Sequence, residues 1–174
     1  MSRRSFEANR ATTVERDKRY TVKEYTPESC VKTLLALMPI DKNDYVLDAG
    51  SGINKVWFKN IDTTRKDEVE IDEGKDFYNF TDKVDWVVGN PPFTELVGFI
   101  KHSAEISQKG FAFLTNHARI NQITPKRLGD LEEKGFYLSR IHIMSIKAWF
   151  GRYYFLVFTK NKNDGIGYSR ENFA

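Results

Sequence analysis

The chain has 174 residues, of which 40% are hydrophobic and 29% are charged. This length suits one domain with a full core and is short for two. Its single cysteine, Cys30, excludes an internal disulfide and is expected in the core. No early apolar run resembles a signal peptide, and no stretch approaches a membrane span. These features predict a soluble, cytoplasmic protein that does not bind membranes.

Charge is distributed unevenly along the chain, although the net charge is only +3. Residues 1–23 carry seven Lys/Arg against three Asp/Glu, residues 41–110 carry nine against fourteen, and residues 111–174 carry ten against five. A negative middle between positive ends would suit an anionic polymer that is held by the ends near a central site. Ordinary solvated surface would give the same counts, so charge alone leaves both interpretations open.

Helices and strands alternate along the middle of the chain. Residues 26–39 have apolar side chains at helical spacing, with Thr26 expected as the N-cap and Pro27 at the first helical position. A second helix is expected to end with Gly110 as its C-cap. The remaining predicted elements are strands over residues 45–49, 67–72, 84–90 and 111–115 and a helix over residues 124–135.

Residues 136–160 are rich in β-branched and aromatic side chains and break at Gly151, which predicts two antiparallel strands. The whole pattern predicts an α/β fold with a Rossmann-like sheet that is mostly parallel, an antiparallel C-terminal hairpin and helices on both faces. Three regions follow: a basic, flexible arm over residues 1–19, one catalytic domain over residues 20–160, and a polar tail over residues 161–174.

A glycine turn follows the first predicted strand, with the sequence DAGSG at residues 48–52. Glycines let a backbone approach a ligand closely, and Glu70, 20 positions after Gly50, is placed to accept from ribose hydroxyls. Lys55 stands where the NAD fingerprint requires glycine, and no Gly-Lys-Ser/Thr of a P-loop follows. The acid that opens the turn, Asp48, suits a ligand with a positive centre or an amine.

The sequence NPPF at residues 90–93 ends another predicted strand at the same edge of the sheet. The two prolines cannot donate to a sheet ladder, so hydrogen-bond acceptors remain beside an aromatic ring. A nucleobase amino group is a poor nucleophile, but its two N–H bonds are good donors. The side-chain oxygen of Asn90 and the carbonyl of Pro91 would accept these bonds and aim the nitrogen lone pair, while Phe93 would stack on a planar substrate.

Together these segments resemble the S-adenosylmethionine-dependent amino-methyltransferases that carry [D/N/S]-P-P-[Y/F]. The resemblance extends over about residues 20–159 and includes KEYTP, VLDAGSG, VEID, KDF and GNPPF in that family's order. It implies the class I methyltransferase fold and S-adenosyl-L-methionine as the cofactor. The cofactor-binding residues that it implies are Tyr25, Thr26, Pro27, Asp48, Gly50, Gly52, Glu70, Asp76 and Phe77, and the catalytic residues are Asn90, Pro91, Pro92 and Phe93.

In this resemblance residues 25–27 close over the methionine end of the cofactor, and Asp76 accepts from the adenine amino group beside Phe77. The sequence departs from the family at Asn54, where many members have glycine, and between Glu70 and Asp76, where the usual helix and strand do not fit. Two further residues, Trp149 and Phe150, are candidates for stacking on the substrate, although hairpin core would look the same. The three histidines lack the spacing of metal ligands, so no metal is expected.

The substrate is open at this stage, because the motif serves DNA, RNA and the glutamine amide of release factors. The chain adds little to its catalytic domain, and in this compactness it most resembles small DNA adenine-N6 methyltransferases. The resemblance favours DNA over RNA as the substrate. An aromatic Phe93 in place of Tyr favours RNA adenine methylation as the alternative. A release-factor enzyme would carry an added N-terminal helical domain, and a non-catalytic subunit would show no turnover. A missing target-recognition domain implies relaxed specificity, an unpaired substrate, or a protein partner or homodimer.

Overall fold

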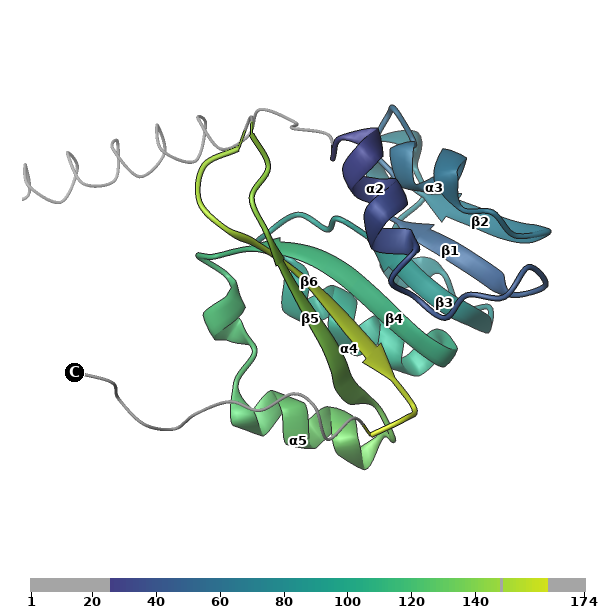
Figure 1. Cartoon of the computed structure of the whole chain (residues 1–174). Helices are drawn as coiled ribbons and strands as arrows, with labels where there is room; N and C mark the ends of the chain where they lie inside the picture. The colour runs from purple at the N-terminus through teal and green to yellow at the C-terminus, as the bar shows by residue number, and fades with distance from the viewer. Residues whose placement is uncertain (1–25, 148, 163–174) are drawn as a thin grey trace, which may run out of the picture.

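The computed structural model describes residues 26–147 and 149–162, so Tyr25, the predicted arm and residues 163–174 of the predicted tail lie outside it. Six strands form one sheet in the order β2-β1-β3-β4-β6-β5 (Figure 1). The first four strands are parallel, and β6 pairs antiparallel with both β4 and β5. This confirms the predicted sheet. The strands are β1 (Tyr45–Ala49), β2 (Arg65–Val69), β3 (Val84–Gly89), β4 (Ser107–Asn116), β5 (Tyr137–Met144) and β6 (Tyr153–Thr159).

Helices cover both faces of the sheet, as expected (Figure 1). On one face lie α2 (Glu28–Leu35) and α3 (Val56–Asn60), and on the other lie α4 (Leu96–Ile106) and α5 (Pro125–Glu133). Three 3-10 turns, η1 (Ile71–Glu73), η2 (Phe77–Asn79) and η3 (Ile120–Gln122), complete the fold. None of the helices in the described part of the chain has the length and apolarity needed to cross a bilayer.

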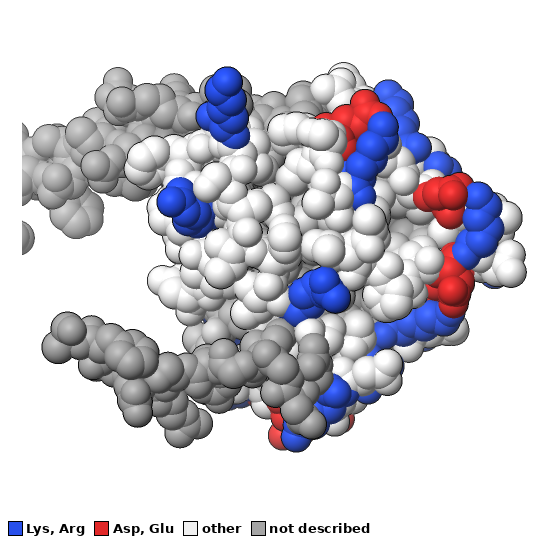
Figure 2. Space-filling view, in the orientation of Figure 1, with Lys and Arg blue, Asp and Glu red and all other residues white. Residues whose placement is uncertain are grey.

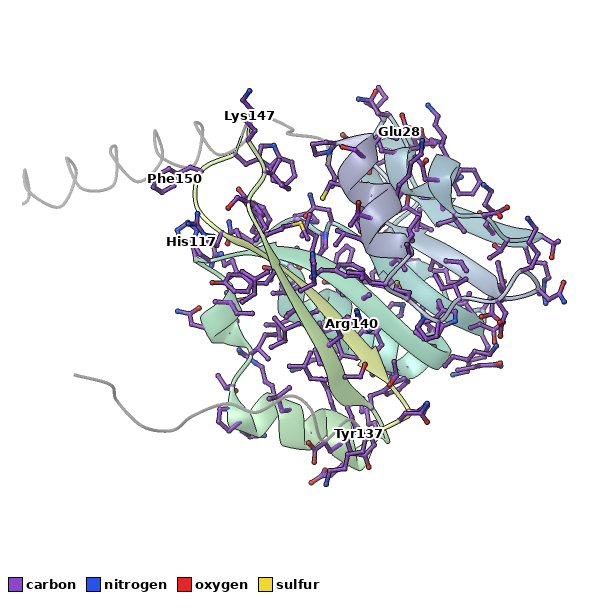
Figure 3. All side chains as sticks on the ribbon, viewed as in Figure 1. Glu28, His117, Tyr137, Arg140, Lys147 and Phe150 are labelled. Carbon is purple, nitrogen blue, oxygen red and sulfur yellow. The ribbon has the colours of Figure 1, made fainter. Side chains whose placement is uncertain are left out.

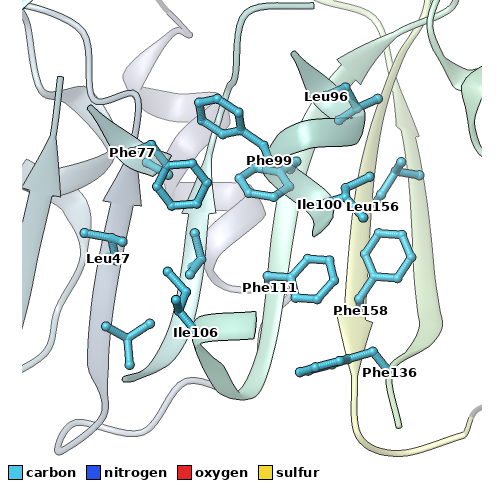
Figure 4. Packing of buried hydrophobic residues seen from close by; sticks show 14 of the residues in the cluster. Leu47, Phe77, Leu96, Phe99, Ile100, Ile106, Phe111, Phe136, Leu156 and Phe158 are labelled. Carbon is cyan, nitrogen blue, oxygen red and sulfur yellow. The ribbon is translucent and has the colours of Figure 1, made fainter. Parts of the chain in front are cut away.

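The core has two layers, one on each face of the sheet. Side chains alternate along a strand, so Phe111 and Phe113 of β4 enter one layer, while Ala112 and Leu114 enter the other. The layer under α4 and α5 combines Phe rings with Leu, Ile and Val side chains, as Figure 4 shows. Phe111 stacks on Phe158 of β6, with ring centroids 4.9 Å apart. Burial on both faces explains why β4 reads as a continuous apolar run.

Two local predictions were wrong. The predicted C-cap, Gly110, lies inside β4, because α4 ends at Ile106. A Cβ at Gly110 would collide with the Trp86 ring and the Phe158 carbonyl, so this glycine is required for packing between strands. Thr26 does not cap α2 either; Pro27 holds the N-cap position without a side-chain hydrogen bond.

Candidate active site

The glycine turn joins β1 to the end of β2. Gly50 and Gly52 have φ values of 74° and 64°, in the left-handed region that favours glycine. The backbone N–H groups of Gly50 and Ser51 donate to the Val69 carbonyl at 2.9 and 3.1 Å, which fixes the turn at the carboxyl edge of the sheet. Lys55 also has a positive φ, of 49°, at the position where a dinucleotide fingerprint would place its third glycine.

Glu70 lies directly after β2 and reaches back to the glycine turn. One carboxylate oxygen accepts from the Gly52 N–H at 2.6 Å, and the other accepts from the Asp72 N–H at 3.3 Å. The side chain therefore stabilises the turn as well as lying where the sequence places a ribose-binding acid. Each carboxylate oxygen can accept more than one hydrogen bond, so both oxygens of Glu70 can still accept from a ligand.

Asp48 is fully buried in β1 beneath the same turn. Its Oδ2 accepts from the Phe58 N–H at 2.9 Å, whereas its Oδ1 has no hydrogen-bond partner within the described residues. Burial raises the pKa of this carboxyl to about 8. A buried carboxyl of this kind is neutral near pH 7 and ionises more readily when a cation lies beside it, so the site is suited to a positively charged ligand.

The end of β3 approaches β1 closely at this edge. A Cβ at Gly89 would lie 2.5 Å from the Ala49 carbonyl, so no other residue fits there without a shift. Asn90 follows at once, and its Nδ2 donates to the Thr26 hydroxyl at 3.3 Å. Its side-chain oxygen is buried and has no partner in the described structure. The end of β3 therefore carries a buried hydrogen-bond acceptor to which no described residue donates.

Thr26 joins two predicted parts of the site that lie 64 residues apart. It is buried, and its hydroxyl accepts from the Trp57 indole N–H at 3.4 Å as well as from Asn90. The structure therefore brings the start of α2, the end of β1 and the end of β3 to one edge. After Asn90, Pro91 is buried, and Phe93 is half-buried against the core layer under α2.

Asp76 is the N-cap of η2 and Phe77 is its first residue, and η1 lies between them and Glu70. The Asp76 carboxylate accepts from the Tyr78 N–H at 3.0 Å and so caps the turn. The Phe77 ring packs against the Phe99 ring in the core under α4, with ring centroids 4.5 Å apart. The observed contacts of this pair are structural, and its role at the adenine end of a cofactor stays a prediction.

The two stacking candidates of the β5–β6 loop differ in exposure, and Figure 3 labels Phe150, the exposed one. Trp149 is only 8% exposed, and its ring lies 4.8 Å from the Tyr153 ring, which is the hairpin-core arrangement. Phe150 is 81% exposed and has the His117 ring 6.0 Å away. Of the two, Phe150 alone is free to stack on a ligand, and that role stays a prediction.

One charged residue of the site, Glu68 of β2, carried no signal that the sequence analysis recognised. It accepts from Ser51 at 2.8 Å, from Lys55 at 3.0 Å and from Lys75 at 2.6 Å. Burial opposes its ionisation, but the hydrogen bonds from Lys75, Lys55 and Ser51 outweigh it and lower the pKa to about 2. Glu68 thus ties the glycine turn to the segment after Glu70. The described residues contain no group of three His, Cys, Asp or Glu side chains that could hold a metal.

A scan against protein-family models gave no match, and neither did a search of curated proteins. Solved structures do match the chain. Magnesium protoporphyrin IX methyltransferase from Synechocystis PCC 6803, solved with bound SAM, is 16% identical with a TM-score of 0.56, over 77% of each chain. The fold is that of class I S-adenosylmethionine-dependent methyltransferases.

Two further solved structures share this fold with the chain. TrmN from Thermus thermophilus is 17% identical with a TM-score of 0.58, over 81% of this chain and 51% of TrmN. The Mtq2–Trm112 complex of E. cuniculi, responsible for methylation of the eRF1 translation termination factor, is 18% identical with a TM-score of 0.51. That match covers 79% of this chain and 98% of the other. At these identities the likeness establishes the fold and leaves the substrate to the residues of the site.

Proposed function

We propose that this protein is an S-adenosyl-L-methionine-dependent methyltransferase that acts on the exocyclic amino group of a nucleobase, adenine N6 in DNA. The observation that carries the proposal is the buried, unpartnered side-chain oxygen of Asn90 at the end of β3. A buried acceptor without a partner is costly, so its retention beside two prolines indicates a ligand donor. The resemblance to amino-methyltransferases with NPPF supports the same assignment.

The residues of the glycine turn fit the cofactor. The cofactor supplies a methyl group on a positively charged sulfur. Gly50 and Gly52 leave the backbone accessible, Glu70 is placed for ribose hydroxyls, and the buried carboxyl of Asp48 suits the cationic methionine end. The solved methyltransferase with bound SAM supports this choice of cofactor.

At the strand end, Asn90 and Pro91 would accept the two amino hydrogens of the substrate. These hydrogen bonds hold the nitrogen lone pair out of the ring plane and aim it at the electrophile. The Thr26 hydroxyl fixes the Asn90 amide by accepting from its Nδ2, which leaves the side-chain oxygen to accept from a substrate. The methylated nitrogen then releases a proton to solvent, so a basic side chain with a shifted pKa is not required.

The distribution of charge supports a nucleic-acid substrate. Residues 107–162 carry ten Lys/Arg against three Asp/Glu, and all three acids lie in α5 or its last turn. In Figure 2 the surface over β5 and β6 shows isolated Lys and Arg side chains, while on the side of α2, β1 and β2 Asp and Glu lie among further Lys and Arg. The β5–β6 loop presents exposed Lys147, Phe150 and Arg152 at the edge that carries the site (Figure 3). Cations beside an exposed ring suit phosphates and bases.

RNA adenine is the second candidate, because Phe93 rather than Tyr follows the prolines. A tritiated-methyl transfer assay that offers duplex DNA, single-stranded DNA, RNA and protein tests both, with nucleoside mass spectrometry of the product. We expect label in N6-methyladenine, greatest with DNA. Label in RNA alone would replace DNA as the substrate, label in protein glutamine would overturn the nucleobase assignment, and no transfer by folded protein would overturn the activity.

A further inference from the structure

The segment between β2 and β3 lacks the support that a sheet strand would give it. Residues 70–83 contain only the two 3-10 turns η1 and η2, and β2 is the edge strand of the sheet that the described residues form. Phe77 anchors this segment to the core under α4. A segment with so few backbone ladder bonds needs side-chain contacts to hold one position.

Tyr78 supplies a second contact, and it runs to the helix that follows the NPPF turn. Its hydroxyl donates to the Glu95 carboxylate at 3.0 Å. Its ring packs edge-on against Phe99 and against His102, with centroids 5.8 Å away in both cases. A Cβ at Gly98 would collide with the Tyr78 hydroxyl, so this glycine opens the place on α4 that the phenol occupies.

Glu95 belongs to the turn that leads out of the proposed catalytic motif. Its backbone N–H donates to the Pro92 carbonyl at 2.8 Å, and its own carbonyl accepts from the Phe99 N–H at 2.9 Å. Glu95 therefore closes the proline turn and begins α4 at the same residue. A hydrogen bond to its side chain links the segment that contains Asp76 to the turn that contains Asn90.

We propose that Tyr78 and Glu95 are a positioning pair that holds the adenine end of the cofactor site against the proline turn, where the described residues provide no further strand. The inference rests on the proposed function, because it assigns residues 76–78 to the cofactor edge. Burial and the hydrogen bond to Glu95 raise the pKa of Tyr78 to about 12, so the phenol remains a donor over the working pH range. Tyr78 is 41% exposed, which places the bond at the rim of the site.

The test compares Tyr78→Phe, Glu95→Ala and Glu95→Gln with the wild-type protein. Tyr78→Phe keeps the ring and loses the hydroxyl, and Glu95→Gln keeps an oxygen that can accept from it. We expect Tyr78→Phe and Glu95→Ala each to weaken S-adenosylmethionine binding by about 5- to 20-fold in calorimetry, as for loss of a partly exposed hydrogen bond to a charged group. Glu95→Gln should bind within about threefold of the wild type, and the double variant Tyr78→Phe/Glu95→Ala should lose no more than either single change.

Amide hydrogen exchange without cofactor provides a readout that does not depend on activity. Exchange in residues 71–80 should become faster in Tyr78→Phe and in Gly98→Ala, which displaces the phenol by contact. The matched control is Tyr137→Phe, which removes a phenol hydroxyl at the start of β5. If Tyr78→Phe exchanges its amide hydrogens and binds the cofactor as the wild type does, the positioning pair is wrong and the proposed function stands. Failure of the wild-type protein to bind the cofactor would overturn the proposed function, and with it the role given to the pair.

Discussion

The two ends of the sheet share one architecture and differ in charge. At the β1–β2 end, three acids, Asp48, Glu68 and Glu70, lie in or directly beneath the glycine turn. At the β5–β6 end, residues 134–162 contain six Lys/Arg and no Asp or Glu. This difference agrees with the proposed function, in which the β1–β2 end takes a cationic cofactor and the β5–β6 end takes a polyanion.

The largest effect is expected for Asn90, which lies between the two ends of the sheet. Asn90→Ala should lower the methyl-transfer rate at saturating cofactor by about 100-fold, the scale lost when one preorganised polar contact is removed. Cofactor affinity should stay nearly unchanged, because Thr26, the cofactor-site residue that Asn90 hydrogen-bonds, keeps its bond from the Trp57 indole N–H. Single-turnover kinetics and calorimetry measure the two quantities, with the exposed Asn79→Ala as the control. Transfer at the wild-type rate by folded Asn90→Ala would contradict the proposed role.

The acidic end is tested next by removing its ribose-binding candidate. Glu70→Ala should weaken cofactor binding by roughly 1.5–3 kcal/mol, because it removes charge-assisted hydrogen bonds to the ligand. The same change also releases the Gly52 N–H, so part of the loss reflects a looser turn. Glu70→Gln retains an acceptor for Gly52 and separates the two contributions. Calorimetry that finds equal affinity for the wild type and Glu70→Ala would remove Glu70 from the site.

Asp48 makes the acidic end sensitive to pH. Its native pKa of about 8 lies above the reference value of 3.8, so the folded protein binds a proton that the unfolded chain releases between these values. The free energy of unfolding should therefore fall as pH rises from 4 to 8, by about 1–3 kcal/mol relative to Asp48→Asn after relaxation around the charge.

Urea unfolding at several pH values measures this difference, and the exposed Asp82→Asn should show no comparable trend. Asp48→Asn should also bind S-adenosylmethionine more weakly, since a neutral amide cannot balance a positive ligand. A stability difference between the wild type and Asp48→Asn that does not change with pH would show that Asp48 is ionised in the folded protein.

The smallest effect is expected at the basic end. Lys147→Glu in the β5–β6 loop should lower nucleic-acid affinity by about 3- to 10-fold at low salt and reduce the slope of log affinity against log salt by roughly 1–2. Lys59→Glu, an equal charge change on the exposed side of α3, is the control at the other end of the sheet. Fluorescence anisotropy over a salt series distinguishes them. Equal slopes for both variants would mean that the polymer does not contact this loop.

Much of the fold follows from local pattern. β-Branched and aromatic residues that break at Gly151 predict the C-terminal hairpin, and the helix expected from residue 124 does begin there, where the Thr124 hydroxyl accepts from the Arg127 N–H at 3.3 Å. The glycine turn and the NPPF segment lie at strand ends because glycine and proline act on the backbone of their own residues. These properties require no knowledge of distant neighbours.

Other features depend on contacts between residues far apart in the chain. The local sequence predicts Gly110 as a helix end. Only the fold places the Trp86 ring and the Phe158 carbonyl beside it, where they leave no room for a Cβ. Trp149 and Phe150 are adjacent aromatic residues, and only packing of the loop buries the first and exposes the second.

The properties of the site also divide into those that local sequence predicts and those that depend on tertiary packing. Local sequence places Asp48 and Asn90 at strand ends, but the raised pKa of Asp48 comes from burial by the whole sheet and its covering helices. The Thr26–Asn90 and Tyr78–Glu95 bonds join residues 64 and 17 positions apart. Burial and long-range hydrogen bonds depend on how elements pack, and packing depends on all their side chains together, so no local pattern contains them.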